Sequence, residues 1–295
     1  MATVKEVYGE LAYEMVRNSH QPGRITHDAI FQESNLQNRA LINQILDELV
    51  QPKSTFVGAE HVLELYRRCQ AGETALLLLE HYSNFDIPCL FYLLHKLGAE
   101  YGEAAESIVA MAAMKLNEES KFVLAFTEAY TRIVIYPGRA LEQVATTEQG
   151  EEEVRKAKQI NMSAMREMVR CKNTGRIVLL FPTGTRYRPG VPDSKRILRA
   201  VDTYIKGFQN AVFVGIAGNV LLVNSESEMS EDFINPDTVT FAASPVISCS
   251  EFRNNARAEA ASPDDIKNVV ADSVGRKLAE MHQIAEAERA RIIGS

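Results

Sequence analysis

A histidine and an aspartate stand five positions apart where an apolar run of the chain ends. The run 74–79 leads into Glu80, and His81 and Asp86 follow it. On a regular helix this offset would place the two side chains about 140° apart, whereas a turn can bring them together. Asp86 would then hold one imidazole nitrogen and leave the other free to take a hydroxyl proton. The pattern therefore predicts a general base, which typically contributes ~10²–10⁴-fold in rate.

A simpler interpretation exists for each of the two residues. Asp86 precedes Ile87 and Pro88, and a proline in the first helical turn makes Asp86 a plausible helix N-cap. His81 could be a partly buried residue of the turn. The two roles of Asp86 are compatible, because a carboxylate has two oxygens.

Two arginines follow a later apolar run, 176–181. The chain continues there as Pro182-Thr183-Gly184-Thr185-Arg186-Tyr187-Arg188-Pro189. Guanidinium groups two residues apart in extended chain point the same way, which suits a dianionic phosphate, and the hydroxyls of Thr183 and Thr185 could add donors. The alternative is that Arg186 and Arg188 form surface ion pairs.

Arg139 is a third candidate cation, because it follows Tyr136-Pro137-Gly138 at the end of another apolar run. Ligands of an open α/β sheet gather beyond the carboxyl ends of its strands. A base at one strand end and cations at two others therefore indicate acylation of a phosphorylated alcohol. Lys195, Arg196 and Arg199 form a candidate patch for an acidic carrier protein, or simply a solvated helix face.

The elements that must position these residues alternate between strands and helices. Continuous apolar runs predict buried strands at 74–80, 107–113, 131–136, 176–181 and 211–217, and a strand at 238–243 is expected at an edge. Helical stretches are expected at 87–97, 118–129 and 151–171. We therefore predict an α/β fold with a mixed, largely parallel sheet flanked by helices.

The chain before this region has a helical character. Helical periodicity is clearest at 35–50 and 59–69, and no β pattern occurs before Thr74. We therefore expect a small helical N-terminal domain, residues 1–72, and an α/β domain, residues 73–295. A charged amphipathic helix is expected at 263–293, at the end of the second domain.

Composition excludes several classes of function. The 295 residues are 46% apolar with a net charge of −7, which argues against a nucleic-acid binder and requires any anion site to be local. The four cysteines share no metal-ligand spacing and indicate reduced thiols, and no cofactor or metal is expected. Neither a signal segment nor an apolar run near the ~20 residues of a membrane span is visible. The expected location is cytoplasmic, with room for peripheral contact at a membrane surface.

The motifs together resemble those of a known family, the glycerolipid acyltransferases, which move an acyl group from a thioester to glycerol 3-phosphate or lysophosphatidate. The residues from His81 to Asp86, including Asn84, look like its first motif, a histidine and an aspartate separated by four residues. The segment 135–139 is similar to the second motif, and 181–186 to the third, a Phe-Pro-Glu-Gly-Thr-Arg block. The closer likeness is to soluble plastid-type glycerol-3-phosphate acyltransferases, which have a helical N-terminal domain and an Arg-x-Arg-Pro ending. Thr183 stands in place of the usual glutamate, as a small hydroxyl residue does in that branch.

The resemblance implies a role for each matching residue. His81 would be the base and Asp86 its partner, while the acceptor would be bound by Asn84, Arg139, Thr183, Gly184, Thr185, Arg186 and Arg188. The implied partners are glycerol 3-phosphate as acceptor and acyl-CoA or acyl carrier protein as donor. Two alternatives stay open, a lysophosphatidate acyltransferase and a non-catalytic phospholipid-binding protein.

Overall fold

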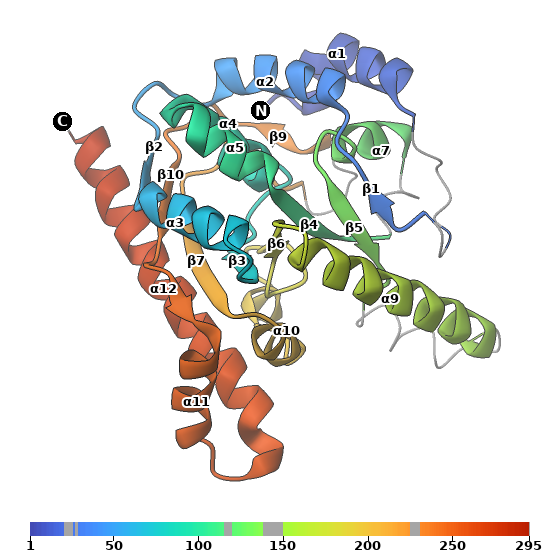
Figure 1. The fold of residues 1–295 in the computed structure, drawn as a ribbon. Coiled ribbons are helices and arrows are strands. Elements are labelled where there is room, and N and C mark those ends of the chain that lie inside the picture. Colours follow the sequence, from blue (N-terminus) through green and yellow to red (C-terminus); the bar gives the residue numbers. More distant parts are fainter. Residues whose placement is uncertain (21–25, 27–28, 115–119, 138–149, 225–230, 295) are drawn as a thin grey trace.

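The computed structural model describes residues 1–20, 26, 29–114, 120–137, 150–224 and 231–294. A nine-stranded sheet forms the centre of this described part of the chain (Figure 1). Its strands are β1 (Phe31–Gln32), β2 (Thr55–Val57), β3 (Ala75–Leu79), β4 (Ile108–Ala113), β5 (Arg132–Ile135), β6 (Ile177–Leu180), β7 (Asn210–Ala217), β10 (Thr240–Ala243) and β11 (Ile247–Ser248). The order across the sheet is β1-β5-β4-β6-β3-β7-β10-β2, and β11 pairs with the start of β7. The five strands from β5 to β7 run parallel, and β1 and β10 are antiparallel to their neighbours β5 and β7. A separate hairpin joins β8 (Leu221–Leu222) and β9 (Phe233–Ile234).

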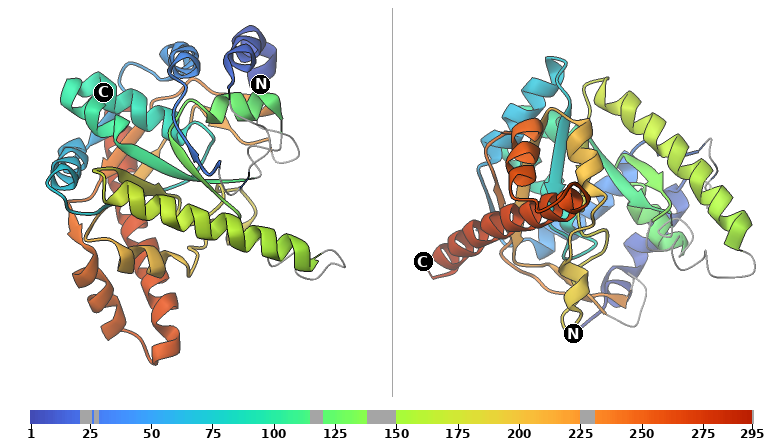
Figure 2. Two further views of the ribbon diagram at one scale, coloured as in Figure 1. Left: turned by 45° about the vertical axis from the view of Figure 1, so that its right-hand side comes forward. Right: turned by 90° about the horizontal axis from the view of Figure 1, so that it is seen from below.

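Helices cover both faces of this sheet (Figures 1 and 2). One face carries α1 (Val4–Asn18), α2 (Leu36–Leu49), α3 (Ala59–Gln70), α4 (Asp86–Leu97), α5 (Ala99–Glu106) and α7 (Lys121–Thr127). The other carries α9 (Gly150–Lys172), α10 (Val201–Gly207), α11 (Cys249–Ala258) and α12 (Ile266–Ile293). Short 3-10 turns lie at Pro192–Lys195 (η1) and Pro263–Asp265 (η3).

The central strand β3 shows why both faces are covered. Leu77 and Leu79 pack with the helices from α1 to α7, whereas Leu76 and Leu78 pack with α9 to α12. Every residue of β3 is buried, as expected of a strand between two helical layers. The predicted mixed, largely parallel sheet flanked by helices is therefore confirmed.

Two short strands depart from the expected organisation. β1 and β2 lie before Thr74, although the sequence shows no β pattern there, because two and three residues are too few to display an alternation. β2 occupies the outer position beside β10, so the expectation that strand 238–243 lies at an edge is wrong. The predicted boundary at residue 72 falls in the turn between α3 and β3, and the helices before it share one hydrophobic cluster with the sheet.

Helix α2 illustrates how local sequence sets an element boundary. The Asn35 side chain accepts hydrogen bonds from the amides of Gln37 and Asn38, which otherwise have no partner inside the helix. The expected helix at 35–50 is therefore confirmed. Within the part of the chain that the structure describes, no helix is both long and apolar enough to cross a membrane.

Helix α12 approaches β7 unusually closely. A Cβ atom added to Gly215 of β7 would stand 2.3 Å from the backbone nitrogen of His282 in α12. Only a glycine fits there, because backbone on both sides leaves no atom free to move aside. The position of α12 over the sheet therefore depends on this residue.

We predict that Gly215→Ala destabilises the protein by about 1–3 kcal/mol or more, because one methyl group overpacks the contact between β7 and α12. Thermal unfolding followed by circular dichroism measures the loss. Gly9→Ala in α1 is the matched control, since a Cβ at Gly9 meets nothing within 4 Å. Equal melting temperatures for the two variants would contradict this account.

Candidate active site

The two predicted turns leave the sheet side by side. β3 and β6 are parallel neighbours, with Leu78 in register with Leu180, so their carboxyl ends meet at one edge. The backbone amide of Tyr187 donates to the carbonyl of His81 at 2.7 Å. The His81 ring stacks on Phe181, with 3.8 Å between ring centroids and 15° between planes. The turn after β3 and the turn after β6 are thus in direct contact.

His81 and Asp86 are brought together within the first turn. The distance from His81 Nδ1 to Asp86 Oδ2 is 2.8 Å, and Asp86 is only 4% exposed. A carboxylate accepts but does not donate, so we assign the proton of the neutral ring to Nδ1. Nε2 is then the basic nitrogen, on a side chain that is 17% exposed.

Asp86 is itself held by the turn that it closes. Its Oδ2 accepts from the amides of Tyr82 at 2.7 Å and Ser83 at 3.0 Å, and its Oδ1 accepts from the Ser83 hydroxyl at 3.2 Å. The alternative N-cap interpretation is wrong, since Phe85 occupies the N-cap position of α4 and the carboxylate points back into the turn. The Asp86 carboxylate therefore orients the His81 ring and does not cap α4.

The turn after β6 is tight, and most of the polar groups described below form hydrogen bonds within it. Gly184 has a φ of +64°, which favours glycine, and its amide donates to the carbonyl of Phe181. The Thr183 hydroxyl donates to the carbonyl of Thr185 at 2.7 Å, so its proton is used inside the turn. The hydroxyl of Thr185 has no partner among the described residues.

Arg186 and Arg188 occupy different surroundings, although the sequence predicts that they point the same way. Arg186 is 17% exposed and donates from Nη1 to Asp232 Oδ2 at 2.7 Å. Arg188 is exposed, and within the described chain its guanidinium has no ion pair. Its backbone is fixed by Ser194, whose hydroxyl accepts from the Arg188 amide at 2.9 Å. The free charge of this turn therefore belongs to Arg188.

Asp232 is a residue that the sequence analysis missed. It is fully buried, and its Oδ2 also accepts from the Asn84 side chain at 3.2 Å. Burial raises the pKa of Asp232, and the guanidinium of Arg186 opposes that rise. No motif surrounds it, and 148 residues separate it from Asn84, so no local signal could have identified it. Arg139 lies outside the described residues.

A second missed group flanks the histidine. Glu80 Oε2 lies 3.0 Å from His282 Nδ1, and Glu80 Oε1 accepts from the Tyr82 hydroxyl at 3.2 Å. Tyr82 stacks near His282 and meets Tyr187 edge-on. Because Glu80 and Tyr82 are the chain neighbours of His81, helix α12 supports the base through the residue on either side.

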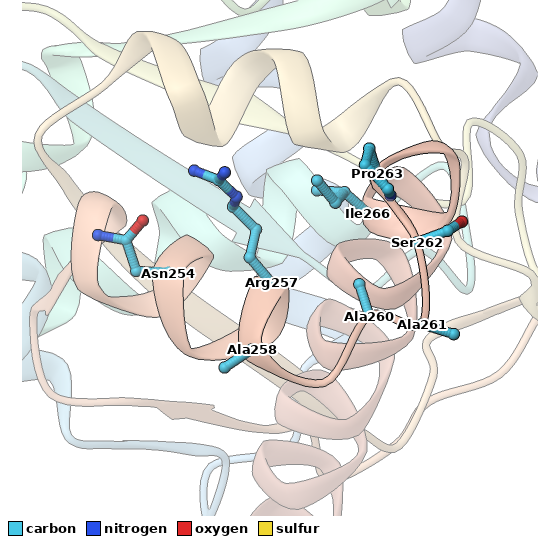
Figure 3. Close-up of a pocket in the computed structure, with 8 residues that line it drawn as sticks. All are labelled: Asn254, Arg257, Ala258, Ala260, Ala261, Ser262, Pro263 and Ile266. Carbon is cyan, nitrogen blue, oxygen red and sulfur yellow. The ribbon is translucent and has the colours of Figure 1, made fainter.

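A surface pocket lies away from these two turns. It is formed between α11 and the start of α12 (Figure 3). Its lining consists of Asn254, Arg257, Ala258, Ala260, Ala261, Ser262, Pro263 and Ile266. Ile266 is sixteen positions before His282, a distance of about 24 Å along the helix, so this pocket is remote from His81. In the described part of the chain no group of three or more acidic, histidine or cysteine side chains could hold a metal ion.

No protein-family model matches this chain, and no curated protein is significantly similar to it. The likeness to glycerolipid acyltransferases therefore depends on the three motifs alone. What the structure adds is geometry, namely that the first and third motifs touch.

We predict that His282 stabilises the fold more at low pH than at high pH. Its hydrogen bond with Glu80 raises the pKa of His282 above the value of about 6.5 expected in the unfolded chain. The protonated form therefore favours the folded state, and this contribution is complete below about pH 6.5 and lost as pH rises through the folded pKa. His282→Gln should lower the melting temperature more at pH 6 than at pH 9. A loss that is equal at both pH values would contradict the prediction.

Proposed function

We propose that this protein is an acyltransferase that moves a fatty acyl group from a thioester to the hydroxyl of glycerol 3-phosphate. The thioester donor is acyl-CoA or acyl carrier protein. The observation that carries the proposal is the contact between the two turns, through His81 and Phe181, which brings the His81–Asp86 pair against the turn that carries Arg186 and Arg188. The likeness of three motifs to the glycerolipid acyltransferases supports the same reaction.

The proposed chemistry begins at Nε2 of His81. This nitrogen takes the proton of the acceptor hydroxyl while Asp86 stabilises the imidazolium that forms. The alkoxide attacks the thioester carbonyl, the tetrahedral intermediate collapses with loss of the thiolate, and the thiolate takes the proton from His81. No acyl-enzyme forms in this scheme, so the nucleophile is the acceptor itself.

The oxyanion of the intermediate needs hydrogen-bond donors, and most amides of the first turn are already used. Those of Tyr82 and Ser83 bind Asp86, and that of Phe85 donates to the Ser83 hydroxyl. The amides of Asn84 and Ile87 have no acceptor among the described residues. We propose these two, at the N-terminus of α4, as the oxyanion donors.

The acceptor's phosphate is assigned first to Arg188. Its charge is not compensated by a described carboxylate, whereas Arg186 is paired with Asp232. Lys195 adds a further cation close by, with its ammonium 4.3 Å from the Tyr187 ring centroid.

We propose that the protein works in the cytoplasm. The acylated product is amphiphilic, so we also propose that the protein meets a membrane surface peripherally.

We predict that His81→Ala lowers the turnover number by about 10²–10⁴-fold while the protein stays folded, because only the base is lost. Thiol release from acyl-CoA, dependent on added glycerol 3-phosphate, measures turnover. His95→Ala is the matched control, since His95 lies on α4 and bonds Glu106, away from the turn. Near-normal turnover in His81→Ala would exclude His81 as the base. Thiol release without any acceptor would indicate a thioesterase, and none with any acceptor a non-catalytic binding protein.

We predict that Arg188→Ala raises the KM for glycerol 3-phosphate more than the KM for the acyl donor. A charge-assisted hydrogen bond contributes about 1.5–3 kcal/mol, which corresponds to at least a tenfold change. Arg166→Ala, an exposed arginine of α9, is the control. An equal loss with an alcohol that lacks a phosphate would contradict the role of Arg188. Lysophosphatidate in the same acceptor panel tests the alternative acceptor.

A further inference from the structure

We infer that Asp232 is a positioning residue of the proposed acyl transfer, which acts by holding Arg186 and Asn84 in fixed orientation between the two turns. The inference rests on the proposed function, since it assigns a role within that site. It adds a residue from outside all three motifs and gives the two arginines of the second turn different tasks.

The contacts of Asp232 join three distant parts of the chain. Oδ2 accepts a hydrogen bond of 2.7 Å from Nη1 of Arg186, which lies in the turn after β6. It also accepts one of 3.2 Å from Nδ2 of Asn84, which lies in the turn after β3. Oδ1 accepts from the Asn224 amide at 2.8 Å, and the Asp232 carbonyl accepts from the Val4 amide at 3.1 Å. One oxygen therefore sets the distance between the Asn84 side chain, in the turn after β3, and the Arg186 guanidinium, in the turn after β6.

Burial makes this arrangement rigid. Asp232 has no exposed surface and Arg186 is 17% exposed, so neither charge can leave the pair without remaining unpaired in a poorly solvated place. A guanidinium carries five N–H donors in a fixed plane, and Asp232 engages Nη1. The donors that remain on Arg186 are consequently held in one orientation.

The negative charge of Asp232 gives Arg186 and Arg188 different roles. Asp232 compensates the charge of Arg186, so Arg186 orients a bound phosphate more than it attracts one, while Arg188 supplies uncompensated charge. Such a site suits a single phosphate monoester. A carboxylate beside the guanidinium also opposes anion binding, so its removal should strengthen phosphate affinity and weaken catalysis together.

Asp232→Asn tests the inference, because the amide keeps the volume and one acceptor oxygen but loses the charge. We expect the turnover number to fall about tenfold or more, and the affinity for inorganic phosphate, measured by calorimetry, to rise about threefold to tenfold. Loss of structure alone would not tighten phosphate binding. Asp237→Asn is the matched control, since Asp237 pairs with Arg289 at 2.6 Å on α12 and touches neither turn. It should leave both quantities unchanged.

A double-mutant cycle with Arg186→Gln tests whether Asp232 acts through Arg186. In the Arg186→Gln background the further change Asp232→Asn should have little effect on turnover, whereas phosphate affinity should still rise, because a negative charge is removed. This pair of neutral side chains leaves no buried charge unpaired if the single variant fails to fold. Unchanged turnover in Asp232→Asn, weaker phosphate binding, or additive effects on turnover in the cycle would overturn the inference. A wild-type protein that binds phosphate but transfers no acyl group would refute the proposed function, and the phosphate affinity of Asp232→Asn would still test whether Asp232 faces the phosphate site.

Discussion

The parallel pairing of β3 with β6 is the constraint on which the rest of the candidate site depends. Because both strands end at the same edge, the turns that follow them must share one space, and a ring contact and a backbone hydrogen bond fix them to each other. A shift in register between these strands would separate His81 from the turn that carries Arg186 and Arg188, without altering the sequence of either turn. The chemistry is therefore a property of the strand order as much as of the residues.

Two buried carboxylates show how the same chemical group does different work at this edge. Asp86 is surrounded by donors of its own turn and orients an imidazole. Asp232 receives donors from separate segments and ties them together. In both cases burial removes competing water, so each hydrogen bond specifies an orientation more strongly than an exposed one would.

Sequence reasoning succeeded where the signal is local or periodic. The fold class, the helix at 35–50 and the five parallel strands follow from continuous apolar runs and capping residues, which depend on near neighbours. It failed for β1 and β2, which are too short to carry a period, and for the order of β10 and β2, which is set by tertiary packing. Within the site, the meeting of His81 and Asp86 was predictable from five residues of spacing. Asp232 and His282 were not, because their partners are 148 and 202 residues away.

The contact between α12 and the residues beside His81 has a consequence for how the protein is made. His282 bonds Glu80, which precedes it by 202 residues, and the Val4 amide bonds the carbonyl of Asp232, which lies far along the chain. Contacts of such long sequence separation form late, since a large loop must close before they are gained. On the ribosome, the surroundings of the histidine would remain incomplete until nearly the whole polypeptide had emerged, so a nascent chain could hold a formed sheet and still be unable to catalyse.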